Sequence, residues 1–359
     1  MSLPPAGAGT PLSELTTLRL GGPADRLVEP TSDEDLVAVV RDAETAGQRV
    51  YVIAGGSNIV VADEGLRGVV VRVRTSGIEE LPGRAGRVRV EVAAGHHWDS
   101  FVRWCVRRRY AGIEALSGIP GSVGAAPIQN VGAYGQSVSE SIVEVRVLER
   151  RTGDILTLDR DACRFDYRMS VFKEHPERWI VLGVTFALQA DTPTTFLRSP
   201  EVAKRLKLGQ AEPAPLPDIR RAVLAVRRHK GMLVGGKDGN AWNVGSFFVN
   251  PTLDTHGFAE FQRRVAAQLG DGVSPSATDE GNGSMRVHAA WLIERAGFHR
   301  GYGDPEGIAL STKHALVLTN RGSGTTVKLL ELARTIAATV HHKFGLTLVP
   351  EPSFLGVDW

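Results

Sequence analysis

The segment that most restricts how this chain can fold lies at residues 118–135, which read GIPGSVGAAPIQNVGAYG. It holds five glycines in 18 residues and lacks the apolar periodicity of a helix or a strand. A loop of this length is uncommon as a passive connection inside a compact domain. Because glycine has no Cβ, such backbone can turn freely and approach a ligand closely. We therefore expect the segment to bind a large phosphorylated ligand, with ordinary tight turns as the alternative.

A second glycine loop, Gly55-Gly56-Ser57-Asn58, directly follows the apolar run at 49–54. Consecutive backbone N–H groups in such a loop can form an anion-binding nest, although a simple tight turn explains these residues equally well. Neither glycine segment has G-x-G-x-x-G spacing, and no Gly-Lys-Ser/Thr follows. The sequence therefore supports neither a standard Rossmann dinucleotide site nor a P-loop.

Composition narrows the class of protein. The 359 residues include 42 Lys plus Arg and 40 Asp plus Glu, and this near balance argues against a dedicated binder of nucleic acid or anionic membranes. Cys105 and Cys163 have no CxxC neighbour, so we expect neither a disulfide framework nor a metal site. The N-terminus lacks a signal-peptide pattern, and no run of about 18 apolar residues occurs. We expect a cytoplasmic, enzyme-sized protein of two or three domains.

Periodicity and capping residues predict alternating helices and strands, with no internal repeat. A helix is expected from the Ser32 cap to Gly47, and a polar, proline-bearing linker at 191–217. Further helices are expected at 98–109, 218–230, 256–269, 287–296 and 325–344. Strands are expected at 49–54, 68–73, 88–92, 143–148, 155–158 and 179–188.

Several motifs, in order from about residue 13 to residue 356, resemble one family. They are TLRLGGPAD at 17–25, the two glycine segments, FDYRMSVFK at 165–173, GSFFVNP at 245–251 and Pro350-Glu351. Together they are similar to the UDP-N-acetylenolpyruvoylglucosamine reductases, the MurB family.

The resemblance implies an α+β fold. After a tail at 1–12, residues 13–190 would form an FAD-binding domain of the vanillyl-alcohol-oxidase (PCMH) type with two α+β subdomains. Residues 191–217 would be an insert and linker, and 218–359 a substrate-binding domain. NADPH would reduce noncovalent FAD, and the reduced flavin would convert UDP-N-acetylglucosamine enolpyruvate to UDP-N-acetylmuramate in cell-wall synthesis. Oligomeric state stays open, with a monomer slightly favoured, and NADPH has no recognisable site of its own.

The reaction implies which side chains are needed. Hydride addition to an enol ether conjugated to a carboxylate builds negative charge there, so the site needs a fixed cation and a general acid. The resemblance assigns Arg168 as the cation and Ser246 and Glu351 as candidate proton sources, without choosing between these two. Without the resemblance, the three would be read as a surface arginine, a turn serine and a solvated glutamate.

The same resemblance implies the binding residues. Cofactor contacts are expected at Gly55, Gly56, Ser57, Asn58, Gly118, Ile119, Pro120, Gly121, Ser122, Gly124, Ala125, Gln129, Asn130, Gly132, Ala133, Tyr134 and Gly135. Substrate contacts are expected at Tyr167, Lys230, Asn250 and His314.

One departure concerns the insert, where Ser199 stands in place of a tyrosine that closes over the UDP-sugar in many members; Phe196 is the nearest aromatic. The role of the segment at 231–242 is open. Arg107-Arg108-Arg109 is interpreted as a solvated helix face. Two alternatives remain: another flavoenzyme of the same fold, such as a sugar or hydroxy-acid oxidase, and a module that binds a nucleotide-sugar without turnover.

Overall fold

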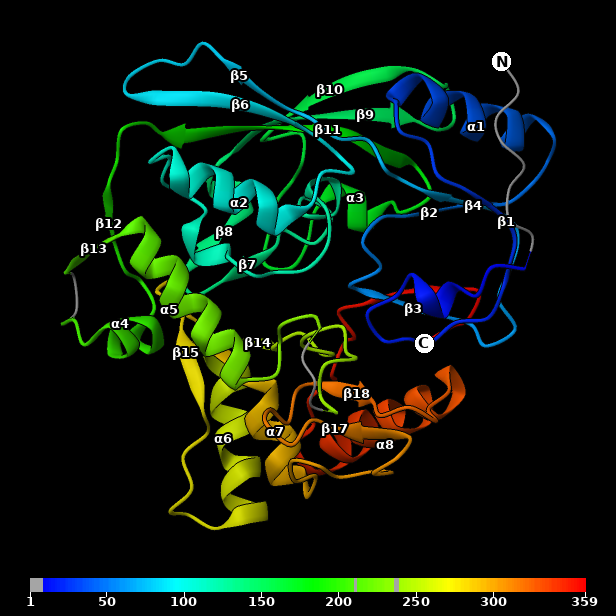
Figure 1. The fold of residues 1–359 in the computed structure, drawn as a ribbon. Coiled ribbons are helices and arrows are strands. Elements are labelled where there is room, and N and C mark those ends of the chain that lie inside the picture. The colour runs from blue at the N-terminus through cyan, green and yellow to red at the C-terminus, as the bar shows by residue number, and fades with distance from the viewer. Residues whose placement is uncertain (1–8, 210–211, 236–238) are drawn as a thin grey trace. The chain divides into compact units, whose positions relative to one another are not determined.

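The structure is a computed structural model, and it describes residues 9–209, 212–235 and 239–359. Most of the expected tail at 1–12 therefore lies outside the described residues. The chain divides into two compact units, which are coloured by residue number in Figure 1. Of the described residues, unit 1 holds 9–10, Pro23–Gly56 and Leu66–His229, and unit 2 holds Pro11–Gly22, Ser57–Gly65 and Lys230–Trp359.

Unit 1 begins with a small parallel sheet. Its strands run in the order β1 (Ala24–Val28), β4 (Leu66–Arg72) and β2 (Val50–Ile53). Helix α1 (Asp33–Thr45) packs on it through an apolar face that includes Leu36 and Val40. The Ser32 side chain accepts a hydrogen bond from Asp35 N–H and so caps α1, as the sequence predicted.

The larger sheet of unit 1 is antiparallel and five-stranded. Its order is β10 (Ile155–Asp159), β9 (Ile142–Glu149), β11 (Trp179–Gln189), β6 (Arg87–Ala93) and β5 (Ile78–Leu81), and Figure 1 shows the central strands side by side. Helix α2 (Trp98–Arg107) packs on this sheet, with the rings of Phe101 and Phe186 4.9 Å apart. Both sheets share one apolar core.

The expected linker at 191–217 is instead a folded element of unit 1. Strands β12 (Thr194–Phe196) and β13 (Pro213–Pro215) pair antiparallel, and between them α4 (Pro200–Leu206) begins at Ser199, which caps it. Although the stretch is mostly polar, it contributes apolar side chains to a small core. Val202 packs there with Val223 of helix α5 (Leu216–His229). The linker prediction is therefore wrong for the described residues of this stretch.

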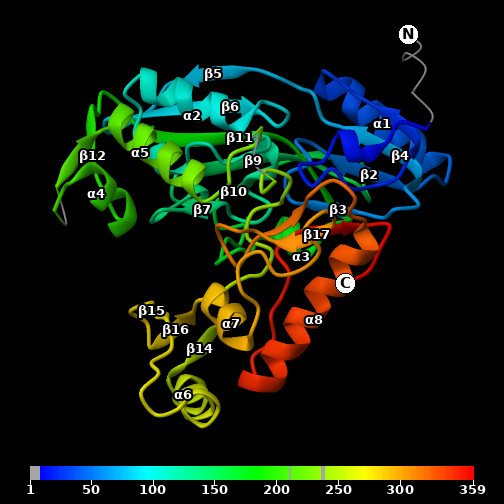
Figure 2. The same cartoon turned by 60° about the horizontal axis from the view of Figure 1, so that its bottom comes forward.

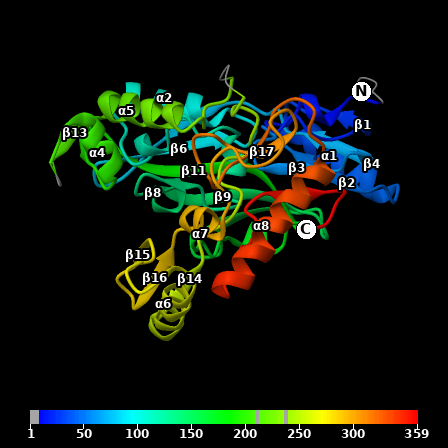
Figure 3. The ribbon, with the colours of Figure 1, turned by 90° about the horizontal axis from the view of Figure 1, so that it is seen from below.

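The position of helix α5 also differs from the prediction. The predicted boundary at 217/218 placed this helix in the C-terminal domain. It lies in unit 1, alongside α4 and α2, as Figure 3 shows. Its apolar residues Ile219 and Val223 are fully buried within this unit. Packing of one helical face therefore moves the boundary to His229.

Unit 2 combines a three-stranded antiparallel sheet with three helices. The sheet order is β14 (Thr252–Asp254), β16 (Ser284–Val287) and β15 (Ala277–Asp279), and α6 (Thr255–Leu269) lies against it (Figure 2). Helices α7 (Ala289–Ala296) and α8 (Thr326–Phe344) share its core, and β17 (Ile308–Leu310) pairs with β18 (Leu318–Asn320). Helix α8 ends at Gly345, in the left-handed region, as the sequence predicted.

Unit 2 is discontinuous in sequence, which the contiguous predicted domains do not capture. Strand β3 (Ile59–Val61) pairs in parallel with β19 (Ser353–Leu355) near the C-terminus. The Thr326 hydroxyl donates to the carbonyl of Val61, and the Asn320 amide donates to the carbonyl of Leu18. These contacts hold residues 11–22 and 57–65 in unit 2.

Both cysteines are buried free thiols. Among the described residues, no helix is both long and apolar enough to cross a membrane. The same part of the chain contains no group of three His, Cys, Asp or Glu side chains placed to hold a metal ion.

Candidate active site

The two glycine segments meet in unit 1. Gly55 follows β2, and a Cβ added to it would lie 2.6 Å from the Cα of Gly121. Atoms do not approach so closely, so the two backbones touch only because glycine stands at this position. The family resemblance implied that both segments contact one ligand, and the structure brings Gly55 and Gly121 together.

The middle of the long segment is fixed by main-chain bonds. Trp98 N–H donates to Gly121 O at 3.0 Å, and Gly124 N–H donates to Ala94 O at 2.8 Å. A Cβ on Gly124 would lie 2.5 Å from the Cβ of Ala94. The segment is therefore laid closely against the chain that leads from β6 into α2.

Ser122, in this middle part, has a buried side-chain oxygen without a hydrogen-bond partner in the described part of the chain. It is 5% exposed, and its hydroxyl has no hydrogen-bond partner among the described residues. A buried hydroxyl without a partner costs free energy, so such groups in native proteins call for an explanation. A polar ligand at this segment would supply the missing partner.

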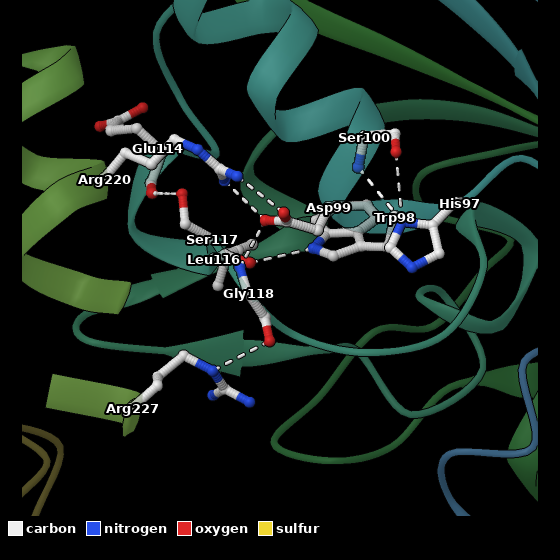
Figure 4. Close-up of polar contacts among 10 residues, drawn as sticks. All are labelled: His97, Trp98, Asp99, Ser100, Glu114, Leu116, Ser117, Gly118, Arg220 and Arg227. Carbon is white, nitrogen blue, oxygen red and sulfur yellow. Dashed lines mark hydrogen bonds and ion pairs between the residues drawn. The ribbon is translucent and has the colours of Figure 1, made fainter. Parts of the chain in front are cut away.

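The start of the segment is held at both main-chain polar groups of Gly118. Gly118 N–H donates to Asp99 Oδ1 at 2.6 Å, and Arg227 Nε donates to Gly118 O at 3.1 Å (Figure 4). Arg220 donates two hydrogen bonds to the same carboxylate, of 2.6 and 2.7 Å. Burial by itself raises the pKa of Asp99, but the bonds from Arg220 and Gly118 outweigh it and leave the pKa below its usual value.

Arg227 also reaches the far end of the segment. It is 8% exposed, and burial lowers the pKa of its guanidinium, while a hydrogen bond with Tyr134 acts in the opposite direction. Burial also disfavours the charged form of Tyr134, and it therefore raises the pKa of that phenol. Helix α5 thus contacts both ends of the glycine-rich segment, at Gly118 and at Tyr134.

Arg168 lies against the same segment. Its Nη2 donates to Gly132 O at 2.6 Å, and its Nη1 donates to Asn130 O at 3.3 Å. Gly132 begins the short strand β7 (Gly132–Ala133), which pairs with β8 (Gln136–Ser137). The structure therefore brings together the predicted cation and the predicted cofactor segment.

Three non-glycine residues here adopt left-handed backbone: Asn130 (φ 44°), Tyr134 (φ 52°) and Arg168 (φ 55°). Such conformations carry a cost and are concentrated at functional sites. Their clustering supports a functional role for this part of unit 1.

The Asn130 side chain holds neighbouring backbone. Its Nδ2 donates to Asp166 O at 2.9 Å, and its Oδ1 accepts from Ser139 N–H at 3.2 Å. The Ser170 hydroxyl, which caps the short helix α3 (Val171–Glu174), donates to Ile128 O. The loop that carries Arg168 is thereby fixed to the glycine-rich segment on both flanks.

Ser246 and Glu351, predicted as proton sources, lie on neighbouring segments of unit 2. Glu351 N–H donates to Phe247 O at 2.8 Å, and Val249 N–H donates to Val349 O at 2.9 Å. Residues 247–249 thus run beside residues 349–351.

Asn58, predicted as a cofactor contact, joins this group. Its side chain donates to Glu351 O at 3.4 Å, and Ser353 N–H donates to its carbonyl at 3.0 Å. The second glycine loop therefore contributes Gly55 and Gly56 to unit 1, whereas Ser57 and Asn58 belong to unit 2.

Two asparagines that sequence reasoning missed organise the region before Ser246. Asn240 Oδ1 accepts from Thr312 N–H at 2.9 Å and from the Ser311 hydroxyl at 3.0 Å. Asn243 Oδ1 accepts from Gly245 N–H at 2.8 Å. An asparagine two residues before a glycine is a known turn pattern and is the signal that could have indicated Asn243.

The segment at 231–242 is anchored at its described ends, while residues 236–238 lie outside the described part. Gly231 O accepts from the Asn243 amide at 3.3 Å, and Asn240 ties the other end to Thr312. His314, two residues beyond, accepts from Leu316 N–H with its Nδ1 at 3.1 Å. The segment thus links the chain after Lys230 to the turn that carries His314.

Two further predicted residues have structural contacts. Asn250 Oδ1 accepts from Ala289 N–H at 2.9 Å, at the start of α7. Tyr167 has the Arg168 guanidinium over its ring, 5.4 Å from the centroid.

Comparison with known proteins decides the family. A protein-family model described as an FAD binding domain matches residues 24–159, and one described as the C-terminal domain of UDP-N-acetylenolpyruvoylglucosamine reductase matches 237–355. The UDP-N-acetylenolpyruvoylglucosamine reductase of Thermobifida fusca is 49% identical over 347 residues, covering 97% of each chain. This chain belongs to the UDP-N-acetylenolpyruvoylglucosamine reductase family. The reductase of Streptomyces coelicolor, 47% identical over 97% of this chain and 89% of its own, agrees.

Solved structures support the fold expected of this family. The MurB of Thermus caldophilus is 22% identical, with a TM-score of 0.61 over 96% of this chain and 97% of its own. The 6-hydroxy-D-nicotine oxidase of Arthrobacter nicotinovorans is 16% identical, with a TM-score of 0.51 over 90% of this chain and 81% of its own. The expected α+β fold with a PCMH-type FAD-binding domain is confirmed.

The residues of unit 1 fit the FAD of this reductase family. The contact between Gly55 and Gly121 leaves backbone without side chains, and the unpartnered hydroxyl of Ser122 lies in the same segment. Backbone amides and a hydroxyl are groups that bind a flavin dinucleotide's phosphates and polyol chain.

Proposed function

We propose that this protein is an FAD-dependent reductase that converts UDP-N-acetylglucosamine enolpyruvate to UDP-N-acetylmuramate with NADPH, in peptidoglycan precursor synthesis in the cytoplasm. The observation that carries the proposal is the position of Arg168 on carbonyls of the glycine-rich segment. In a chain of this family, that position joins the predicted catalytic cation to the predicted cofactor segment.

The glycine-rich residues of unit 1 hold FAD without a covalent bond. The cofactor, when bound, supplies the hydride. Gly55 and Gly121 provide close backbone approach, and Ser122 provides a hydroxyl donor. Asp99 and Arg227 fix the two peptide groups that flank the Gly118 Cα, which reduces the entropy that this residue loses on binding.

Arg168 orients the enolpyruvyl carboxylate and stabilises the charge that develops on it. Two of its hydrogen bonds are to the carbonyls of Asn130 and Gly132, which carry no net charge. These bonds fix the plane of the positively charged guanidinium. A fixed guanidinium is well matched to a carboxylate whose electron density rises during the reaction.

Ser246 and Glu351 deliver the proton at the α-carbon. The main-chain bond between Glu351 and Phe247 keeps the two segments adjacent. The Ser246 hydroxyl and the Glu351 carboxyl therefore belong to neighbouring segments of the same chain. Serine alone is a weak acid and needs such a partner. Lys230 is assigned to the substrate diphosphate, and Tyr167, Asn250 and His314 to other substrate contacts.

Anaerobic half-reactions test the proposal. The purified yellow protein is mixed with NADPH, and bleaching of the flavin band is followed. UDP-N-acetylglucosamine enolpyruvate is then added without oxygen, and the colour should return with formation of UDP-N-acetylmuramate. Colour that returns only when oxygen is admitted would favour an oxidase of the same fold. A colourless protein that takes up no added FAD would overturn the proposal, and flavin retained by acid-precipitated protein would contradict noncovalent binding.

A further inference from the structure

A cavity of about 540 Å³ lies in unit 1, between the C-terminal part of α2 and the start of α5. Four arginines line it, Arg103, Arg107, Arg109 and Arg220, and its remaining lining is apolar and includes Val106 and Leu216. We call this cavity the arginine pocket. No Asp or Glu is among its lining residues.

The positive charge of the arginine pocket is largely uncompensated. Arg220 pairs with Asp99, whereas within the described part of the chain no ion pair joins Arg103, Arg107 or Arg109 to a carboxylate. Arg108, at the same end of α2 but outside the lining, does pair with Glu80 at 2.6 Å. Arg107, Arg108 and Arg109 are all exposed, as the sequence interpretation of a solvated helix face predicted, and Arg107 and Arg109 also border this pocket.

Two structural costs converge on this pocket. Arg103 and Arg107 are four residues apart on α2, where like charges face each other and weaken a helix. Arg109, just beyond the helix, has a φ of 59°, a conformation that favours glycine. Both costs are small, since a left-handed residue commonly ends a helix, but both occur at residues that line the pocket.

We propose that the arginine pocket binds a small-molecule polyphosphate. Guanidinium groups donate planar pairs of hydrogen bonds that match phosphate oxygens, and several of them around one cavity attract a multiply charged anion. The volume lies in the range of small-molecule sites, and apolar lining such as Val106 can contact an uncharged part of the ligand. None of the residues assigned above to FAD or to the UDP-sugar lines this pocket.

The pocket is connected to the cofactor segment through one side chain. Arg220 lines the pocket and also holds Asp99, whose carboxylate accepts from Gly118 N–H (Figure 4). An anion that draws Arg220 away from Asp99 loosens the hold on Gly118. Polyphosphate binding should then weaken FAD binding, and by linkage FAD should weaken polyphosphate binding by the same factor. This second part rests on the proposed function.

Calorimetric titration of the FAD-loaded protein with sodium tripolyphosphate at about 0.15 M salt tests the site. The wild type should bind, and the double variant R103E/R107E should bind at least about tenfold more weakly. The variant R84E/R151E is the matched control, because it makes the same charge change at exposed arginines that do not line the pocket, and it should bind within about twofold of wild type.

The outcomes separate cleanly. Equal weakening in both variants would mean general charge attraction and would overturn the proposal, as would unchanged binding in R103E/R107E or no binding by wild type. The milder variant R103Q/R107Q, whose side chains are exposed, repeats the test if the double charge reversal lowers thermal stability. ATP that binds more tightly than tripolyphosphate identifies a nucleotide as the ligand, and equal binding identifies inorganic polyphosphate; both support the site.

A separate measurement tests whether binding in the arginine pocket weakens FAD binding. Saturating tripolyphosphate should raise the FAD dissociation constant of the wild type several-fold, read from flavin fluorescence, and should leave that of R103E/R107E unchanged. An equal rise in both proteins would place the anion in the cofactor site and contradict the connection. Flavin reduction by NADPH should stay intact in R103E/R107E, so failure of the pocket and failure of the proposed function are distinguishable.

Discussion

The carboxylate of Asp99 accepts a 2.6 Å hydrogen bond from the N–H of Gly118, 19 residues further along the chain. Arg220 of α5 fixes this carboxylate from the other side through two short bonds. The first peptide group of the glycine-rich segment is therefore held by an ion pair between two helices, α2 and α5. Its orientation is set before any ligand arrives.

Asp99→Asn should weaken FAD binding about tenfold. Loss of the carboxylate removes a charge-assisted bond to Gly118 and leaves Arg220 without its partner, a change of about 1–3 kcal/mol. Flavin fluorescence of the reconstituted apoprotein measures the dissociation constant. Arg221→Ala is the control, because Arg221 pairs on the exposed side of α5 with Asp218, and it should leave FAD binding unchanged. Equal effects of the two changes would argue against a specific hold on Gly118.

The same carboxylate predicts a pH dependence. The pKa of Asp99 is lowered in the folded state, so its stabilising contribution is fully present above the unfolded pKa of about 3.9. That contribution is lost as the pH falls through the folded pKa. The difference in unfolding free energy between wild type and Asp99→Asn, measured in urea, should therefore be constant from about pH 7 to pH 5 and shrink below about pH 4. A difference that grew on acidification would contradict the lowered pKa.

Gly55→Ala should damage unit 1. The added methyl would lie 2.6 Å from backbone at Gly121, which cannot give way as a flexible side chain would. We expect a loss of about 1–3 kcal/mol in unfolding free energy, with weaker FAD binding. Gly272→Ala serves for comparison, since nothing lies within 4 Å of its added Cβ, and it should be neutral. Thermal melts of both apoproteins, followed by FAD titration, test this expectation, and a fully stable Gly55→Ala protein would refute the close contact.

Ser122→Ala should have effects of opposite sign with and without FAD. The buried Ser122 hydroxyl has no partner among the described residues, so its removal should leave the apoprotein equally stable or slightly more stable. Because the hydroxyl is expected to bond to FAD, the variant should bind FAD several-fold more weakly, a loss of about 1 kcal/mol in binding free energy. Apoprotein melting and flavin fluorescence give the two readings. Unchanged FAD affinity would remove Ser122 from the cofactor contacts.

Ser246→Ala should separate the two half-reactions. Flavin reduction by NADPH needs no proton from Ser246 and should stay within about twofold of wild type, whereas the reaction with the enolpyruvyl substrate should slow by about 10²–10⁴-fold. Anaerobic stopped-flow absorbance measures both rates. Equal losses in the two half-reactions would assign Ser246 a binding or structural role.

Local sequence determined the elements whose signals are short-range. Ser32 caps α1 because a hydroxyl can accept from an N–H three residues later, and Gly345 ends α8 because it can adopt positive φ. The glycine-rich segment was recognisable from composition alone. The family motifs occur in order along the chain, and they were sufficient to predict the fold that the comparisons confirm.

Tertiary structure alone decided which distant residues meet. Asp99 and Arg220 lie 121 positions apart, and Asn58 and Glu351 lie 293 apart, so no local pattern links them. The stretch at 191–217 was misinterpreted as a linker because its stabilising contacts, such as those of Val202, come from α5 rather than from its own periodicity. Periodicity and caps depend on neighbours in sequence, whereas burial and ion pairing depend on surfaces that exist only once the chain has packed.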